Sequence, residues 1–329
     1  MDMHEDIAQR CTIKPFTNLT RIVEYKFPDS LNRTFGVTCL PHGMEIVNNE
    51  IRCTEKVPTI AVIDMYTSGM GVELGRDLYV NHGIMVTKYA VRGLENKIGI
   101  LGLDLWKSRD CRDCRDCKDE LGTYEGILDA VHELVRIQKC YRNIIALNLS
   151  VGFNRLYRNL SEALEEELSV HNVEEKKEKL LAFLSKQTDG YYAIAYQTIQ
   201  AINQLVDEGV TIYQSTGNAR NLVFNLLLLS NVQYNVSAYD YRRAAVVFSN
   251  RKGNATHFFR RVYGEDNKLT SVTDGMIEIL PHEIRKPAKL TRKKHELILL
   301  PRKVSGTSFS TPLQLNEDLK AGRLGPLER

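Results

Sequence analysis

The chain has 329 residues, of which 43% are hydrophobic, and this is enough apolar sequence for one large core or two modest ones. Its 44 lysines and arginines nearly balance its 41 aspartates and glutamates, so the formal net charge of +3 does not favour nucleic acid or a membrane surface as the main partner. No run of eighteen apolar residues is present, so no membrane-spanning helix is expected.

The amino terminus, MDMHEDIAQR, is charged and lacks the apolar segment of a secretory signal peptide. The seven cysteines are an odd number, which fits a reducing compartment better than a framework of disulfides. We therefore expect a cytoplasmic protein, with export that needs no leader as the open alternative. The oligomeric state is left open.

Residues 1–56 precede the first strongly patterned part of the chain. They contain two runs typical of strands, RIVEYKF (21–27) and TFGVTCL (34–40). We expect an N-terminal extension here that covers the edges of the sheet or helices of the domain that follows.

From about Val57 the chain alternates short apolar runs with longer amphipathic ones. Helical spacing of apolar residues predicts helices over 123–138 and 191–209. This alternation predicts an α/β domain over residues 57–329, with a mostly parallel central sheet flanked by helices. Four runs are typical of strands buried on both faces, namely TIAVIDM (59–65), IGILGLDL (98–105), NIIALNLSV (143–151) and GVTIYQST (209–216).

Two segments are predicted insertions, at about 108–120 and at about 154–189. The first repeats an Arg-Asp-Cys triplet and is interpreted as a tolerant loop. A metal or iron–sulfur site is the alternative, but Cys111, Cys114 and Cys117 lack an obvious fourth ligand. The second is rich in glutamate, lysine and regularly spaced leucines, which favours a solvated helix or helical hairpin outside the sheet, with a docking surface as the alternative.

Four polar residues lie where predicted elements end or begin. Asp64 ends the first strand, His82 precedes a helical run, and Asn218 follows the fourth strand. Ser308 lies in KVSGTSFSTP (303–312), ahead of a predicted helix. Because parallel sheets hold ligands at the carboxyl ends of their strands, we expect these side chains to meet in one site.

The order Asp, His, Asn, Ser and the sequences around these residues resemble the subtilisin-like serine proteases. SGTSFSTP is similar to the nucleophile motif of that family and is the most specific of the likenesses. The resemblance covers roughly residues 57–153 and 190–312, and it implies a three-layer subtilisin-like fold. The other likenesses are TIAVIDM to the aspartate strand, NHGIMV to the histidine motif, NLSVG to the substrate-binding strand and GVTIYQSTGNA to the oxyanion strand.

The resemblance implies a serine endopeptidase that forms an acyl-enzyme intermediate and needs no cofactor or metal. Ser308 is then the nucleophile, His82 the general base, Asp64 the residue that orients the imidazole, and Asn218 the oxyanion donor. The implied partner is a polypeptide substrate, bound as an added strand between two segments. Its candidate contacts are Leu121, Gly122, Tyr124, Ser150, Val151, Gly152, Ser215 and Gly217.

The sequence departs from the family pattern beside two of these residues. The glycine that normally follows the aspartate closely is delayed to Gly69, and Met85 stands where the family has a second histidine. The extension is shorter than the folding segment of secreted relatives, which favours a structural role over an inhibitory one. Because of the two departures beside Asp64 and His82, the main alternative function is a catalytically inactive or gated protein of the same fold that acts as a binding module.

Overall fold

The computed structural model describes residues 18–28, 31, 33–66, 71–75, 78–105, 120–169, 171–218, 222–240, 258–263, 269–274, 276–279 and 302–324. Its helices are α2 (His82–Val91), α3 (Glu120–Tyr141), α4 (Tyr157–Leu164), α5 (Lys177–Ser185), α6 (Gly190–Asp207) and α8 (Thr307–Lys320), with a short 3-10 helix η2 (Leu226–Leu229). None of the helices in these ranges is both long and apolar enough to cross a membrane.

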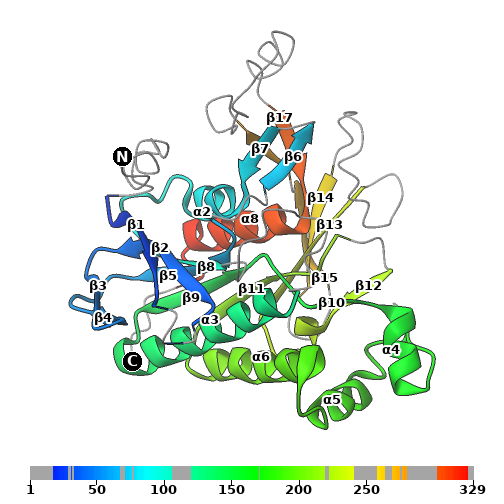
Figure 1. Ribbon diagram of the computed structural model, residues 1–329. Helices are drawn as coiled ribbons and strands as arrows, with labels where there is room; N and C mark the ends of the chain where they lie inside the picture. Colours follow the sequence, from blue (N-terminus) through cyan, green and yellow to red (C-terminus); the bar gives the residue numbers. More distant parts are fainter. Residues whose placement is uncertain are drawn as a thin grey trace.

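Nine strands form one sheet in the order β1-β2-β8-β5-β9-β11-β13-β14-β15 (Figure 1). They are β1 (Thr20–Lys26), β2 (Phe35–Pro41), β8 (Gly99–Leu105), β5 (Thr59–Asp64), β9 (Ile144–Leu149), β11 (Thr211–Ser215), β13 (Tyr234–Asp240), β14 (Phe258–Tyr263) and β15 (Leu269–Asp274). The five central strands, β8 to β13, run parallel, and the two strands added at each side pair antiparallel. The predicted α/β class is confirmed, and the parallel part contains all four predicted strands.

Four smaller strand pairs lie outside this sheet. They are β3 (Met44–Val47) with β4 (Glu50–Cys53), β6 (Gly71–Gly75) with β7 (Leu78–Asn81), β10 (Asn154–Leu156) with β12 (Val223–Asn225), and β16 (Met276–Ile279) with β17 (Arg302–Ser305). The β10–β12 pair matters for the site below, because it joins segments that are far apart along the chain.

The N-terminal strands extend the central sheet on the β8 side. β2 pairs antiparallel with β8, and β1 pairs antiparallel with β2. The backbone N–H of Ile100 also donates to Thr20 Oγ1 at 2.9 Å. Phe27 and Phe35 are buried in the same core as the helices of the following domain. This part of the extension therefore shares the hydrophobic core of the main sheet.

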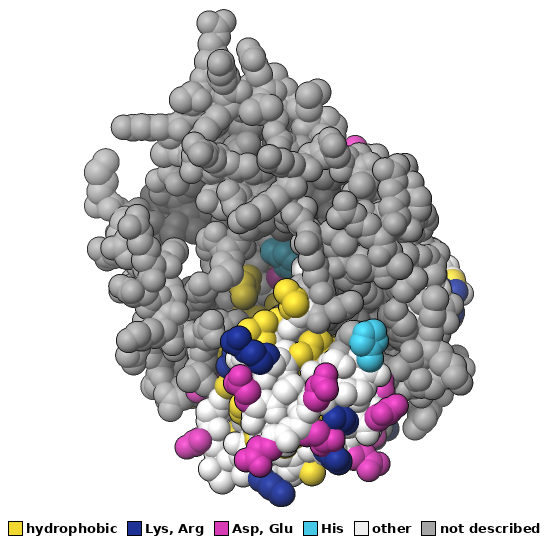
Figure 2. Space-filling model, turned by 90° about the vertical axis from the view of Figure 1, so that its right-hand side faces the viewer, with side chains coloured by type: hydrophobic (Ala, Val, Ile, Leu, Met, Phe, Trp, Pro, Cys, Tyr) yellow, Lys and Arg dark blue, Asp and Glu magenta, His cyan; other side chains and the backbone are white. Residues whose placement is uncertain are grey.

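The segment at about 154–189, which was predicted to be an insertion, forms β10, α4 and α5, beside one end of α6 (Figure 1). Leu180 and Leu184 of α5 are buried in the core that α6 also lines, while Glu166 pairs with Lys176 and Lys179 at the surface. In Figure 2 acidic and basic side chains are scattered over this lower part of the molecule, and hydrophobic side chains lie above them. The triplet repeat with Cys111, Cys114 and Cys117 lies outside the described residues.

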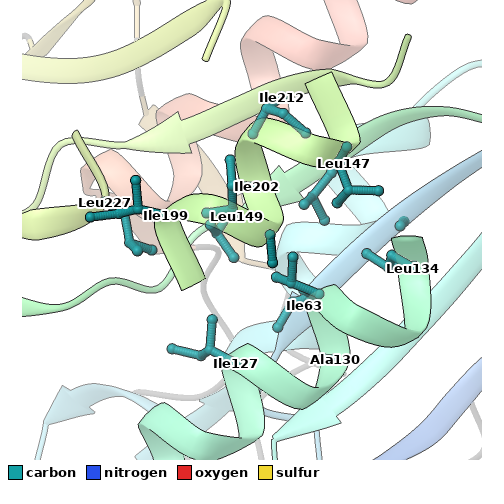
Figure 3. Packing of buried hydrophobic residues seen from close by; sticks show 14 of the residues in the cluster. Ile63, Ile127, Ala130, Leu134, Leu147, Leu149, Ile199, Ile202, Ile212 and Leu227 are labelled. Atoms are coloured by element: carbon teal, nitrogen blue, oxygen red, sulfur yellow. The ribbon is translucent and has the colours of Figure 1, made fainter. Parts of the chain in front are cut away.

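Helices cover both faces of the sheet and make a three-layer arrangement. Along β5, Ala61 and Ile63 belong to a core shared with α3 and α6, whereas Ile60 and Val62 belong to one shared with α2 and α8. Figure 3 shows the first of these cores, where side chains of α3 and α6 meet those of the sheet. Because the central strands are buried on both faces, most of their residues are apolar, without the regular polar alternation of a half-exposed strand.

Candidate active site

Asp64 and His82 form a hydrogen-bonded pair at the carboxyl end of β5. His82 Nδ1 lies 2.7 Å from Asp64 Oδ1, which also accepts from the backbone N–H of Met65 at 2.6 Å. The Asp64 side chain is fully buried, and that of His82 is 20% exposed. A carboxylate accepts and does not donate, so Nδ1 carries the proton and a neutral imidazole has its lone pair on Nε2.

The start of α2 is held against the segment that follows Asp64. Asn81 caps the helix by accepting from the backbone N–H of Ile84 at 2.9 Å, and the backbone N–H of Gly83 donates to the carbonyl of Met65 at 3.0 Å. A methyl group at Gly83 would lie 2.9 Å from the ring of Tyr66, so only glycine permits this approach. These contacts fix the direction from which the His82 ring meets Asp64.

A second buried carboxylate stands beside the first. Asp104 of β8 is the register neighbour of Asp64, and the two side chains are 1% and 0% exposed. Asp104 Oδ1 accepts from the backbone N–H of Tyr66 at 2.7 Å, whose hydroxyl in turn lies 2.6 Å from Thr87 Oγ1 of α2. Asp104 therefore positions the turn that connects Asp64 to the histidine helix.

The pKa of His82 is raised above its ordinary value. Burial of the ring lowers this pKa, while the negative charge of Asp64 and its hydrogen bond to Nδ1 raise it, and together they outweigh the burial. The imidazole is therefore a stronger base than an isolated histidine, which suits it to accept a proton.

Ser308 lies in the first turn of α8, close to this pair. The rings of His82 and Phe309, the residue after Ser308, have centroids 5.3 Å apart. The Ser308 hydroxyl donates to the carbonyl of Ser150 at 3.2 Å, and no hydrogen bond joins it to His82, both of which the structure describes. Ser150 Oγ donates in return to the carbonyl of Ser308 at 2.9 Å. The two serines thus lock the end of β9 to the start of α8.

Asn218 follows β11 and meets the same helix start. Its Oδ1 accepts from the backbone N–H of Thr307 at 3.0 Å and from the Thr307 hydroxyl at 2.8 Å. Because a backbone N–H only donates, the contacting atom of the amide must be its oxygen, and the Nδ2 donors must point elsewhere. Neither Asn218 Nδ2 nor the backbone N–H of Ser308 has an acceptor among the described residues.

A cleft of about 320 Å³ opens beside Ser308, and we call it the Ser308 cleft. It contains the serine, the asparagine and five of the predicted substrate contacts. Its lining residues are Ser150, Val151, Gly152, Asn154, Ser215, Gly217, Asn218, Val223, Asn225, Thr307 and Ser308.

Three further predicted substrate contacts lie elsewhere. α3 begins at Glu120, three residues earlier than predicted, so Leu121, Gly122 and Tyr124 are helical. Tyr124 packs against the rings of Phe153 and Tyr191, with centroids 4.6 Å away in both cases. Because these residues are helical and not extended, this segment offers no strand edge to which a substrate strand could be added.

Four lining residues were not predicted: Thr307, Asn154, Val223 and Asn225. Thr307 precedes the serine, and the other three belong to the β10–β12 pair, which brings together residues 154–156 and 223–225. Asn225 Oδ1 accepts from the backbone N–H of Phe153 at 3.0 Å, and its Nδ2 donates to the carbonyl of Ser215 at 3.0 Å. The close approach to Asn225 requires glycine at 152, since a methyl group there would lie 2.3 Å from Nδ2. The contact between Gly152 and Asn225 could have indicated this part of the cleft, but the sequence alone does not reveal that the two residues lie close together.

Comparison with known proteins finds no match among protein-family models, curated proteins or solved structures. The function must therefore be inferred from the residues of this chain.

Proposed function

We propose that the protein is a serine endopeptidase of the subtilisin-like type, with Ser308, His82 and Asp64 as its catalytic triad and Asn218 as an oxyanion donor. The observation that carries the proposal is the Asp64–His82 hydrogen bond of 2.7 Å, made to a fully buried carboxylate beside the helix start that presents Ser308. The order of the four residues along the chain supports the family assignment.

The reaction begins when a substrate binds beside Ser308 and the Ser308 hydroxyl leaves its hydrogen bond to the carbonyl of Ser150. This hydrogen bond is long at 3.2 Å and therefore weak. The hydroxyl loses little stabilisation when His82 Nε2 replaces the carbonyl as its acceptor. Ser308 Oγ then attacks the carbonyl carbon while its proton passes to Nε2. Asp64 stays ionised and stabilises the imidazolium that forms.

The negative charge that develops on the carbonyl oxygen needs donors at the start of α8. The backbone N–H of Ser308 and Asn218 Nδ2 are both without an acceptor among the described residues. The N-terminal end of the helix dipole adds to their effect. Nε2–H next protonates the leaving amine as the C–N bond breaks, and water hydrolyses the acyl-enzyme by the same route.

Labelling with a fluorophosphonate tests the proposal directly. Wild-type protein is expected to be labelled at Ser308 and to hydrolyse a denatured polypeptide, whereas His82→Ala and Ser308→Ala are not. The Ser308–Ser150 hydrogen bond favours one alternative, a gated protein that binds but does not cleave. Absence of both labelling and hydrolysis in folded wild-type protein would support that alternative and overturn the proposed activity.

A further inference from the structure

The Ser308 cleft adjoins the atoms that would react. Its lining includes Ser308 and Asn218, which we call its rim, and Asn154, Val223 and Asn225 of the β10–β12 pair. A carbonyl oxygen placed between the Ser308 N–H and Asn218 Nδ2 belongs to a residue whose own side chain starts at this rim. The cleft is therefore the space available to the side chain that precedes the cleaved bond.

No lining residue that the structure describes carries an ionisable side chain. A charged substrate side chain that entered the cleft would gain no counter-ion from these residues. The described walls therefore favour an uncharged side chain at this position.

Several polar groups in the walls are already committed to the fold. Asn225 bonds to Phe153, Leu227 and Ser215, with its oxygen and its nitrogen both engaged. Ser150 Oγ donates to the Ser308 carbonyl and accepts from Asn148 Nδ2 at 2.9 Å. These groups shape the cleft but have few unused donors or acceptors with which to hydrogen-bond a ligand.

Two other polar side chains in the walls have their bonding capacity available. Ser215 is only 4% exposed, yet its hydroxyl makes no hydrogen bond within the described part of the chain. Asn154 is exposed, its amide likewise has no partner among the described residues, and its Oδ1 lies close to Gly217. Together they offer two acceptors and two kinds of donor to whatever fills the cleft.

We infer that the Ser308 cleft binds the side-chain amide of a glutamine or asparagine that precedes the cleaved bond, through Asn154 and Ser215. This inference rests on the proposed function and names its substrate class. A primary amide is uncharged and both donates and accepts, so it satisfies both free groups. Val151 and Val223 contact its methylene groups, and the volume of about 320 Å³ accommodates the longer glutamine.

The test compares peptides that differ only at this position, with glutamine, methionine or glutamate. Methionine has nearly the shape of glutamine without its hydrogen bonds, and glutamate has the shape with a charge. We expect kcat/KM for the glutamine peptide to exceed that for methionine about tenfold and that for glutamate about 100-fold.

Variants of the two walls then test the residues. Asn154→Ala and Ser215→Ala are expected to bring the glutamine-to-methionine ratio of kcat/KM close to one. Asn231→Ala is a matched control at an exposed asparagine outside the cleft and should keep the wild-type ratio. A wild-type ratio near one, or a ratio unchanged in both wall variants, would overturn the inference.

Binding to Ser308→Ala separates this inference from the proposed activity. The variant lacks the nucleophile but keeps both walls, so competition among the three peptides reports recognition without chemistry. Tighter binding of the glutamine peptide supports the inference even if wild-type protein hydrolyses nothing. Hydrolysis of all three peptides at similar rates would leave the activity standing and remove the inference.

Discussion

The two parts of the candidate site are held in different ways. Asp64 and His82 are connected by one short hydrogen bond, and backbone donors and a packed glycine fix both residues. The Ser308 cleft is instead open, and its polar groups divide into those that hold the fold and those without partners. The Ser308 hydroxyl donates its hydrogen bond to the carbonyl of Ser150 and not to His82.

The difference corresponds to what each part must do in the proposed reaction. A base and the carboxylate that orients it perform the same task for every substrate, so a rigid arrangement of His82 and Asp64 does not impair the reaction. A nucleophile and its oxyanion donors must exchange their resting contacts for those of the substrate. We therefore expect substitutions in the Asp64–His82 pair to abolish chemistry, and substitutions around the cleft to act on turnover, selectivity or stability separately.

The largest effect is expected from Asp64→Asn. The amide leaves the shape unchanged but favours the wrong tautomer of His82, and kcat should fall about 10⁴-fold. Asp104→Asn is the matched control, since Asp104 is an equally buried neighbour that acts through Tyr66. It should lower kcat by about tenfold or less. Equal losses in the two variants, both checked for folding by circular dichroism, would contradict the assigned roles.

Asn218→Ala is expected to lower kcat by about 100- to 1000-fold with little change in KM, because the lost donor acts on the transition state. It should also destabilise α8 by about 1 kcal/mol, because Oδ1 accepts from the Thr307 N–H. Asn218→Asp separates the two effects, since it keeps an acceptor for Thr307 and removes the donor. If Asn218→Asp retained wild-type turnover, Asn218 would have no role as a donor.

Asn225→Ala tests the wall of the cleft. Removing this 1% exposed side chain leaves the Phe153 N–H and the Ser215 carbonyl without partners, so the free energy of unfolding should fall by about 2–4 kcal/mol. Gly152→Ala alone should also destabilise, because its methyl group would overlap Asn225. In the Asn225→Ala background the same change should cost much less, as measured in a double-mutant cycle. Additive losses would show that the two residues are independent.

The smallest effect concerns pH. The base must be neutral, so kcat/KM should rise with pH through an apparent pKa above 6.5, the ordinary value for histidine. Asp64→Asn removes the attraction that raises this pKa, so the rise of kcat/KM with pH should move to lower pH in the activity that remains.

The raised pKa also means that protonated His82 stabilises the fold below its unfolded-state pKa. This contribution is lost as pH rises through the folded-state pKa, which thermal melts at several pH values would detect.

The parallel strands could be predicted because they are buried on both faces. The predicted runs 59–65, 98–105, 143–151 and 209–216 correspond closely to β5, β8, β9 and β11. Asp64 and Asn218 then followed from the rule that polar residues at strand ends meet at one edge of the sheet, whereas His82 and Ser308 came from motifs that resemble those of the protease family. The start of α3 was predicted too late, since the triplet-repeat segment that precedes it offers several aspartates as capping residues and its sequence does not single out one of them.

The sequence by itself determined the α/β class and the part of the cleft at the ends of β9 and β11, because each depends on a local apolar run and the residues at its end. It gave the candidate triad through the resemblance of the motifs around Asp64, His82 and Ser308 to those of the protease family. Only the tertiary structure decided the part of the cleft formed by Asn154, Val223 and Asn225. Asn154 and Asn225 are about seventy residues apart, and the β10–β12 pairing and the hydrogen bond from the Phe153 N–H to Asn225 bring them together. The choice of which polar groups are free to bind a substrate also depends on long-range partners, such as Asn225 with Ser215 and Ser150 with Ser308. Each of these hydrogen bonds joins residues that are far apart along the chain. The residue types in the sequence therefore do not reveal which donors and acceptors remain free for a substrate.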